Sequence, residues 1–293
     1  MYTRTLCFVL LACVGLTGRP IDGGSYGWSS PGSFAVDVGT PAKAARGGAG
    51  GAMSTEADRH ADTKVLISTF VPKDFVPDGD LGKPVWSTAR KVVFDRDAFQ
   101  NTRYPELETQ VASLWTGEYL YLAYWCKYDS LNTFQGEDPS KERWELWTRD
   151  VVEAFINPQP SRASHYYEFE VAPNNQWLDL EINFSGNQPH PTQWNSGFDH
   201  VTRIDPVRHV WTLEMRIPVE SMGVRRIESN AEWRINLFRA DGPPSGSDRK
   251  FTSWSPLSIP NGSFHQPASF GALRFTRSGS KPEIPRGGSS STQ

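Results

Sequence analysis

The sequence predicts an all-β fold, an antiparallel β-sandwich with two sheets in a jelly-roll or immunoglobulin-like arrangement. Apolar and polar residues alternate in several short runs, helical periodicity is scarce, and Pro-rich and Gly-rich joints separate the runs. The 293 residues are 38% hydrophobic and 12% aromatic, which is enough apolar material for one sizeable core. The 11 Trp and 22 Pro residues favour a β domain over a helix bundle.

Seven runs in the body of the chain are expected to be strands. Thr116-Gly117 and Asn174-Asn175 predict tight turns between neighbouring runs. We expect eight to ten strands in all and no helix of length. The runs cover residues 111–115, 119–128, 151–156, 166–171, 177–183, 210–217 and 233–240.

The alternation separates two faces on each predicted strand. Leu178, Leu180 and Ile182 share one face of the run 177–183. In the run 166–171, Glu168 and Glu170 share a face. One face is expected to be core, whereas the other mixes aromatic side chains with carboxylates, amides and Arg. Two interpretations of this second face stay open: an ordinary solvated face, or a ligand groove that covers the C–H faces of a sugar and binds its hydroxyl groups.

The N-terminus has the pattern of an exported protein. Residues 1–18 predict a signal peptide, with Arg4 before the apolar run 6–16. The segment Leu10-Leu11-Ala12-Cys13 resembles a lipobox, which would place a lipid anchor on Cys13. Export to the periplasm or the extracellular space is therefore expected. If Met53 is the true start, the protein would instead be cytoplasmic.

Two further segments are expected to be disordered. Residues 19–59 form a Gly/Ala-rich linker without periodicity, and residues 277–293 form a polar tail. The folded domain is expected to span residues 60–276.

Charge, hydropathy and cysteine usage argue against a nucleic-acid-binding protein, a membrane-spanning protein and a disulfide-rich protein. The formal net charge is −3, from 30 basic and 33 acidic residues, and no basic stripe is present, so a nucleic-acid partner is not expected. The apolar run 6–16 is too short to span a bilayer. Cys126 stands alone in the body of the chain, which predicts a structural thiol and no disulfide framework.

Seven motifs follow one another along the body of the chain. In order, they are Asp78-Gly79-Asp80 with Trp86, VASLWTGEYLYL (111–122), WTRDVVEAFIN (147–157), WTLEMRIP (211–218), WRINLFRAD (233–241), SWS (253–255) and FHQPASFGALRF (264–275). Their series resembles the family 9 carbohydrate-binding modules, a DOMON-like group of β-sandwiches. The resemblance covers most of residues 76–276.

The resemblance implies non-catalytic binding of carbohydrate. In that family a sugar is held between two aromatic rings, polar side chains bind its hydroxyl groups, and calcium ions hold loops. The implied ligands are plant-type polysaccharide fragments, such as xylan or glucan chains or their ends, in carbohydrate catabolism. Because such modules are usually attached to xylanases and related glycosidases, glycoside hydrolases acting in trans are the implied protein partners.

Carried over by motif, the resemblance implies five carbohydrate-binding residues. Trp147 stands at the first ring and Glu153 at a hydroxyl-binding glutamate. Phe264 stands at the second ring, where the compared member has Trp, and Asn261 occupies an amide position. Glu170 stands where the family has Arg. This reversal of charge should change which sugar fits.

A second departure lies in the late strand, where Phe238 stands in place of a Gln. Independently of the resemblance, Trp147 lies in a charged stretch together with Trp144, which favours a ligand contact over a core position. Glu153 is a lone charge in an apolar run, and it needs a partner if buried. That partner could be a ligand, a metal ion, or an Arg such as Arg216 or Arg234.

Structural calcium is the cofactor expected, with Asp78 and Asp80 as the candidate ligands. Both are oxygen donors near loops, as are Asp129 and Asp150, and calcium prefers such ligands. The alternative for the Asp78-Gly79-Asp80 segment is ordinary turn chemistry.

Two other functions stay open as alternatives. Paired carboxylates, Glu168 with Glu170 and Asp179 with Glu181, lie about 6.6 Å apart along a strand, near the spacing used by inverting glycosidases. Such neighbours point the same way, however, whereas catalytic carboxylates flank the bond. A haem-binding, electron-transfer domain would need axial ligands, for which the candidates are Met215, Met222, His165, His200 and His265.

Overall fold

The structure is a computed structural model, and it describes residues 64–277 except 101, 137, 247 and 261–262. The expected signal peptide, linker and Met53 start therefore lie outside the described residues, as does the tail from residue 278. The predicted domain boundaries at 60 and 276 stay predictions.

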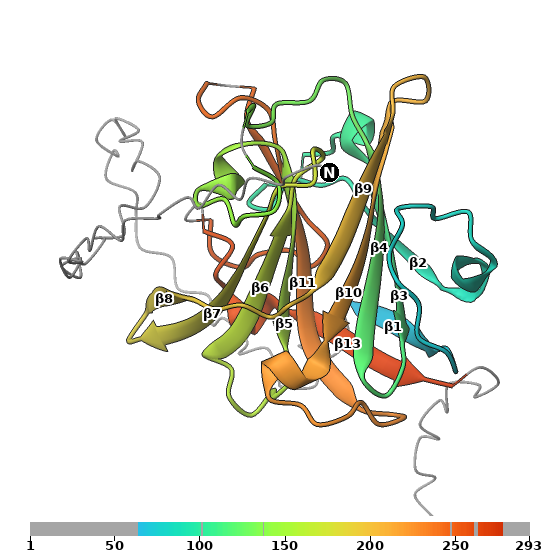
Figure 1. Cartoon of the computed structure of the whole chain (residues 1–293). Helices are drawn as coiled ribbons and strands as arrows, with labels where there is room; N and C mark the ends of the chain where they lie inside the picture. The colour runs from blue at the N-terminus through green and yellow to red at the C-terminus, as the bar shows by residue number, and fades with distance from the viewer. Residues whose placement is uncertain (1–63, 101, 137, 247, 261–262, 278–293) are drawn as a thin grey trace, which may run out of the picture. The chain divides into compact units, whose positions relative to one another are not determined.

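Strands dominate this part of the chain (Figure 1). The described residues contain 13 strands, more than the eight to ten expected, and five short 3-10 turns. All seven predicted runs are confirmed as strands. The strands are β1 (Val65–Phe70), β2 (Lys91–Phe94), β3 (Thr109–Trp115), β4 (Tyr119–Lys127), β5 (Val151–Asn157), β6 (His165–Val171), β7 (Trp177–Ser185), β8 (Gln188–Gln193), β9 (Asp199–Asp205), β10 (Val210–Pro218), β11 (Glu232–Asp241), β12 (Lys250–Ser253) and β13 (Gly271–Thr276).

The strands form one curled sheet whose two halves face each other, which confirms the β-sandwich. The order is β8-β7-β6-β5-β11-β13-β1-β3-β4-β10-β9, with β12 on β11 and β2 on β3. Figure 1 shows β5 to β8 on one side and β3, β4, β9 and β10 on the other. Most pairings are antiparallel, as predicted, but β1 runs parallel to both β13 and β3.

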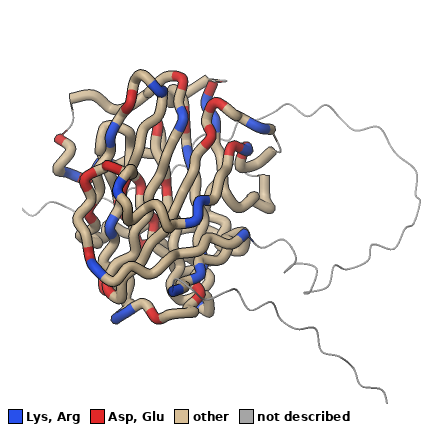
Figure 2. The backbone as a smooth tube through the Cα atoms, turned by 90° about the vertical axis from the view of Figure 1, so that its right-hand side faces the viewer, with Lys and Arg blue, Asp and Glu red and all other residues tan. Residues whose placement is uncertain are grey.

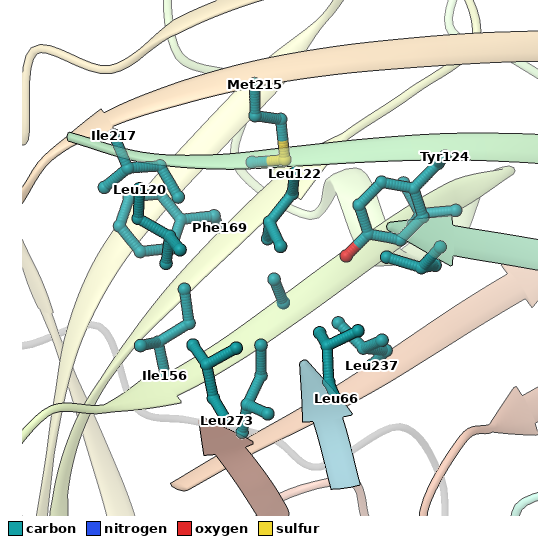
Figure 3. Packing of buried hydrophobic residues seen from close by; sticks show 14 of the residues in the cluster. Leu66, Leu120, Leu122, Tyr124, Ile156, Phe169, Met215, Ile217, Leu237 and Leu273 are labelled. Atoms are coloured by element: carbon teal, nitrogen blue, oxygen red, sulfur yellow. The ribbon is translucent and has the colours of Figure 1, made fainter. Parts of the chain in front are cut away.

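The main core lies between the two halves. Figure 3 shows Leu122, Tyr124 and Met215 from one half packed toward Phe169 and Leu237 from the other. The exposed fractions of all five are at most 1%. Burial of each such side chain stabilises the fold by roughly 1.5–3 kcal/mol. The tryptophans of the strand runs, Trp211 and Trp233, also belong to this core.

The opposite face of the β7-β6-β5-β11 half is buried as well. Its apolar residues form a second cluster with Leu146 and Phe270, and side chains from the segments around 134–147 and 251–264 pack on it. The solvated-face interpretation is therefore wrong for this half, because segments remote in the sequence cover it. The cluster comprises Leu146, Val151, Phe155, Tyr166, Ala172, Leu178, Leu180, Ile182, Phe238, Ala240 and Phe270.

Charged residues are spread over the molecule. Figure 2 shows Lys and Arg interspersed with Asp and Glu on the side in view. In the described part of the chain, no helix has the length and apolar character to cross a membrane.

Candidate functional site

One row of residues crosses the covered face of the sheet. On β11, β5 and β6, Phe238 pairs with Glu153, and Glu153 pairs with Glu170. Neighbouring strands lie about 4.8 Å apart, so this row spans about 10 Å. Phe264 and Trp147 pack against the same cluster. The structure thus brings together four of the five residues implied by the resemblance. The fifth, Asn261, lies outside the described residues, and its role stays a prediction.

A strained turn presents Trp147. Leu146–Thr148 form a single 3-10 turn, and Glu145 before it adopts a left-handed φ of 63°, which is rare for a residue other than Gly. Leu146 is fully buried and anchors the turn in the second cluster. Trp147 is left partly exposed, with its ring edge-on to Trp144 at 5.1 Å between centroids. Trp147 is therefore neither plain core nor a freely solvated side chain.

Phe264 is seated on aromatic partners. Its ring stacks on Phe238 with centroids 4.2 Å apart and planes 10° apart, and on Phe99 at 6.0 Å. The next residue, His265, shares a 2.7 Å hydrogen bond between its Nδ1 and the Tyr166 hydroxyl. Burial lowers the pKa of His265 to about 4, so the ring is neutral at neutral pH. Phe238, where the resemblance leads one to expect Gln, thus supplies a stacking platform in place of a hydrogen bond.

Three carboxyl groups lie on this face, and we call Glu153, Glu168 and Glu170 the glutamate cluster. Their exposed fractions are 3%, 4% and 0%. Burial, followed by the charges of its neighbours, raises the pKa of Glu153 and of Glu170 well above the ordinary value, and burial raises that of Glu168 to about 7. Both carboxyl oxygens of Glu170 and Oε2 of Glu168 lack a hydrogen-bond partner among the described residues. The backbone N–H of Trp147 lies near enough to lower the pKa of Glu170 in part, but it does not complete a hydrogen bond of normal geometry.

The cation near Glu153 is Arg249, which no motif in the sequence singles out. Its positive charge lowers the pKa of Glu153. Neither suggested arginine fills this role. Arg216 pairs with Asp74 and Asp199, and Arg234 donates to the backbone oxygen of Phe270.

The guanidinium of Arg249 also ties the turn of Trp147 to the end of β11. It donates to the backbone oxygens of Gly242 at 2.6 Å, Arg149 at 3.0 Å and Trp147. Asp150 reinforces this connection, since it accepts from the backbone N–H groups of Asn132 and Gly242, each at 2.7 Å. Because Arg249 follows a stretch rich in Pro, Gly and Ser, local sequence carries no signal for this role.

The expected calcium ligands have other partners. Asp78 accepts from the backbone N–H of Asp80 at 2.8 Å and pairs with Lys83 at 3.0 Å, while Asp80 accepts from Gly82 at 2.9 Å. The buried Glu214 binds the same loop through the N–H groups of Asp78 and Gly79. Among the described residues, no group of three or more His, Cys, Asp or Glu side chains has an arrangement that could hold a metal ion. Calcium at Asp78 and Asp80 stays a prediction, and turn chemistry describes the geometry present.

The paired carboxylates and the candidate haem ligands contact other parts of the fold. Glu168 and Glu170 lie two residues apart on β6 and share a face, and Asp179 accepts from the backbone N–H of Ser196 at 2.8 Å. Met215 and Met222 are both 1% exposed in the main core. His165 contacts Glu181 at 2.7 Å.

An open hollow lies beside the aromatic end of the row. Its volume is about 360 Å³, and it is lined by Phe99, Trp254 and Leu257 together with charged side chains that include Asp95 and Arg96. Because Phe99 also stacks on Phe264, this hollow adjoins the Phe264 ring.

A family model described as carbohydrate family 9 binding domain-like matches residues 77–277. The chain belongs to this family. Several solved structures share the fold. A putative carbohydrate-binding protein from Bacteroides uniformis is 20% identical, with a TM-score of 0.59 over 73% of this chain and 100% of that one.

Two structures of a family 9 carbohydrate-binding module from Caldicellulosiruptor kristjanssonii are 15% identical. The complex with cellotriose has a TM-score of 0.52 over 77% of this chain, and the complex with glucose has 0.53 over 76%, each covering 100% of the module. A curated relative, "Extracellular protein" from Arthroderma benhamiae, is 28% identical over 154 residues. The match spans 47% of this chain and 66% of that relative, just under two thirds of its length.

Proposed function

We propose that this family 9 domain binds carbohydrate without catalysis, at the row that joins Phe264, Glu153, Glu170 and Trp147. The observation that carries the proposal is the order of the row. A partly exposed ring lies at the Phe238 end, the backbone of Trp147 approaches the Glu170 end, and carboxyl groups lie between. Aromatic rings cover the C–H faces of a sugar, and carboxyl groups bind its hydroxyls.

The ligand class proposed is a β-linked glucan or xylan chain or its end. The ligands of the Caldicellulosiruptor module, cellotriose and glucose, support this choice. The description of the Arthroderma relative as extracellular supports export. In this proposal the protein acts outside the cytoplasm in polysaccharide breakdown, presents fragments to glycoside hydrolases in trans, and holds structural calcium at Asp78 and Asp80.

Titration calorimetry of the full chain tests the proposal against cello-, xylo- and manno-oligosaccharides. We expect binding to one series, at least a tenfold loss of affinity in Trp147→Ala, and little change in Trp144→Ala. Trp144 is the matched control because it is 40% exposed and touches the same ring. If the folded wild type binds none of the series, or if Trp147→Ala binds as tightly as the wild type, the proposal is wrong.

A further inference from the structure

The glutamate cluster places three carboxyl groups close together on one face of the sheet. Glu153 and Glu170 are direct cross-strand partners, and Glu168 lies two residues from Glu170 on the same face. Like charges directly opposite one another on a sheet are destabilising. The charge of Arg249 acts on Glu153, but the Arg249 guanidinium donates its hydrogen bonds to the backbone oxygens of Gly242 and Arg149. In the part of the chain that the structure describes, a positive charge therefore acts on Glu153, but none acts on Glu168 or Glu170.

Unpartnered oxygens of this cluster point to a ligand group with several donors. Glu170 is 0% exposed, and neither of its carboxyl oxygens has a hydrogen-bond partner among the described residues. A buried carboxylate without a partner is costly, and it is stabilised by a cation or a proton. A primary ammonium group carries a full positive charge and three N–H donors, one for each carboxyl group of the cluster.

We propose that this site prefers an amino sugar, in which a protonated primary amine replaces a hydroxyl group, over the corresponding neutral sugar. The inference rests on the proposed function and specifies its ligand class. Trp147 and Phe264 pack against the same apolar cluster and stay partly exposed, so both rings can contact a ligand on the face that carries the carboxyl groups. The rings would stack on the C–H faces and attract the ammonium group by cation–π interaction.

The surroundings of the cluster predict a proton exchange on binding. When an ammonium group replaces the protons that the carboxyl groups hold, those protons are released to the solvent. The charged and titratable groups packed around this face are Glu153, Glu168, Glu170, Tyr166, Arg234, Arg249 and His265, with Asp150 beyond Arg249.

The experiment is titration calorimetry of the full chain at pH 6.0, where the glucosamine amines are protonated, with three β-1,4-linked tetramers: glucosamine, N-acetylglucosamine and glucose. We expect the glucosamine tetramer to bind at least tenfold more tightly than the other two, with proton release seen as a buffer-dependent heat. Glu170→Gln should remove this preference while its melting temperature stays the same or rises. The control, Glu220→Gln, changes an exposed carboxylate on another part of the fold and should retain it.

Each other outcome overturns the inference. If the glucose tetramer binds and the glucosamine tetramer binds no better, the amino-sugar preference fails but the proposed function stands. If no tetramer binds to the folded protein, both fail. If Ca²⁺ alone binds to the wild type and not to Glu170→Gln, the cluster is a metal site and the amino-sugar assignment is wrong. Should Glu170→Gln not fold, Glu168→Gln replaces it with the same expectations.

Discussion

Phe264 stacks face to face on Phe238, with ring centroids 4.2 Å apart and ring planes 10° apart. Phe238 is fully buried, whereas Phe264 keeps part of its surface exposed. The strand residue therefore serves as a platform that fixes the orientation of the loop residue. In the proposed function, this pairing couples ligand contact and stability at one end of the site.

We expect Phe264→Ala to weaken oligosaccharide binding at least tenfold and to lower the free energy of unfolding by about 1–3 kcal/mol. The loss of stability reflects the lost stacking on Phe238 and Phe99. Calorimetry and chemical denaturation measure the two effects. Ile259→Ala is the control, because Ile259 is 53% exposed and precedes Phe264 in the same segment. Unchanged affinity in Phe264→Ala would remove this ring from the site.

Arg249→Lys should loosen the turn that presents Trp147. A lysine ammonium cannot reproduce the planar fork that reaches three backbone oxygens, so we expect a loss of about 1–3 kcal/mol in stability. Hydrogen exchange should become faster in residues 146–150, and sugar affinity should fall. Arg208→Lys serves as control, since the Arg208 side chain is 82% exposed. Equal exchange rates in the two variants would show that Arg249 does not hold this turn.

The glutamate cluster predicts a pH-dependent gain in stability for Glu168→Gln. Burial raises the pKa of Glu168 from 4.5 to about 7 in the folded protein. Between these values the folded wild type holds a proton that the unfolded chain releases, so the contribution of Glu168 to stability falls as pH rises from about 4.5 to 7. The amide of the Glu168→Gln variant does not titrate and has no such loss. The stability difference, variant minus wild type, should therefore rise across this range by an amount on the order of 3 kcal/mol and level off above pH 7.

Urea denaturation at pH 4, 5.5, 7 and 8 measures this difference. Glu220→Gln, which changes an exposed carboxylate on another part of the fold, is the control. A constant difference for Glu168→Gln would mean that folding does not raise the pKa of Glu168.

Calcium binding at Asp78 and Asp80 predicts a higher melting temperature in millimolar CaCl2 than in EDTA. The double substitution Asp78→Asn with Asp80→Asn should abolish that increase, because it removes both carboxylates but retains oxygen acceptors for the turn. Thermal denaturation of both proteins in each buffer checks this. If the wild type melts at the same temperature in both buffers, the calcium prediction is wrong. Asp78 and Asp80 would then serve only the turn, by accepting from the N–H groups of Asp80 and Gly82 and by pairing with Lys83.

Much of the fold follows from local pattern. Alternation along the runs around Tyr121, Phe169 and Leu213 predicted the strands correctly, because side chains on a strand point to opposite faces with a period of two. The same periodicity places Glu168 and Glu170 on one face. The motif order placed Trp147 and Phe264 in one site, and the structure packs both against one cluster.

Other features depend on contacts between remote segments, which a local pattern does not contain. Alternation does not reveal that the second face of the sheet is covered. The sequence pattern around a carboxylate is the same whether water or a loop covers that side chain. The pairing of β1 with β13 joins residues separated by most of the domain. The placement of Arg249 beside Glu153 depends on how the loop after β11 folds back.

The sequence by itself determined the strands, the all-β class and the residue types available for a sugar site, because these depend on side-chain periodicity and motif order. Only the tertiary structure decided that Glu153, Glu168 and Glu170 are buried together, that Phe238 seats Phe264, and that Arg249 holds the turn of Trp147. The free energy of a charged side chain depends strongly on whether it is buried, and burial is a property of the whole fold.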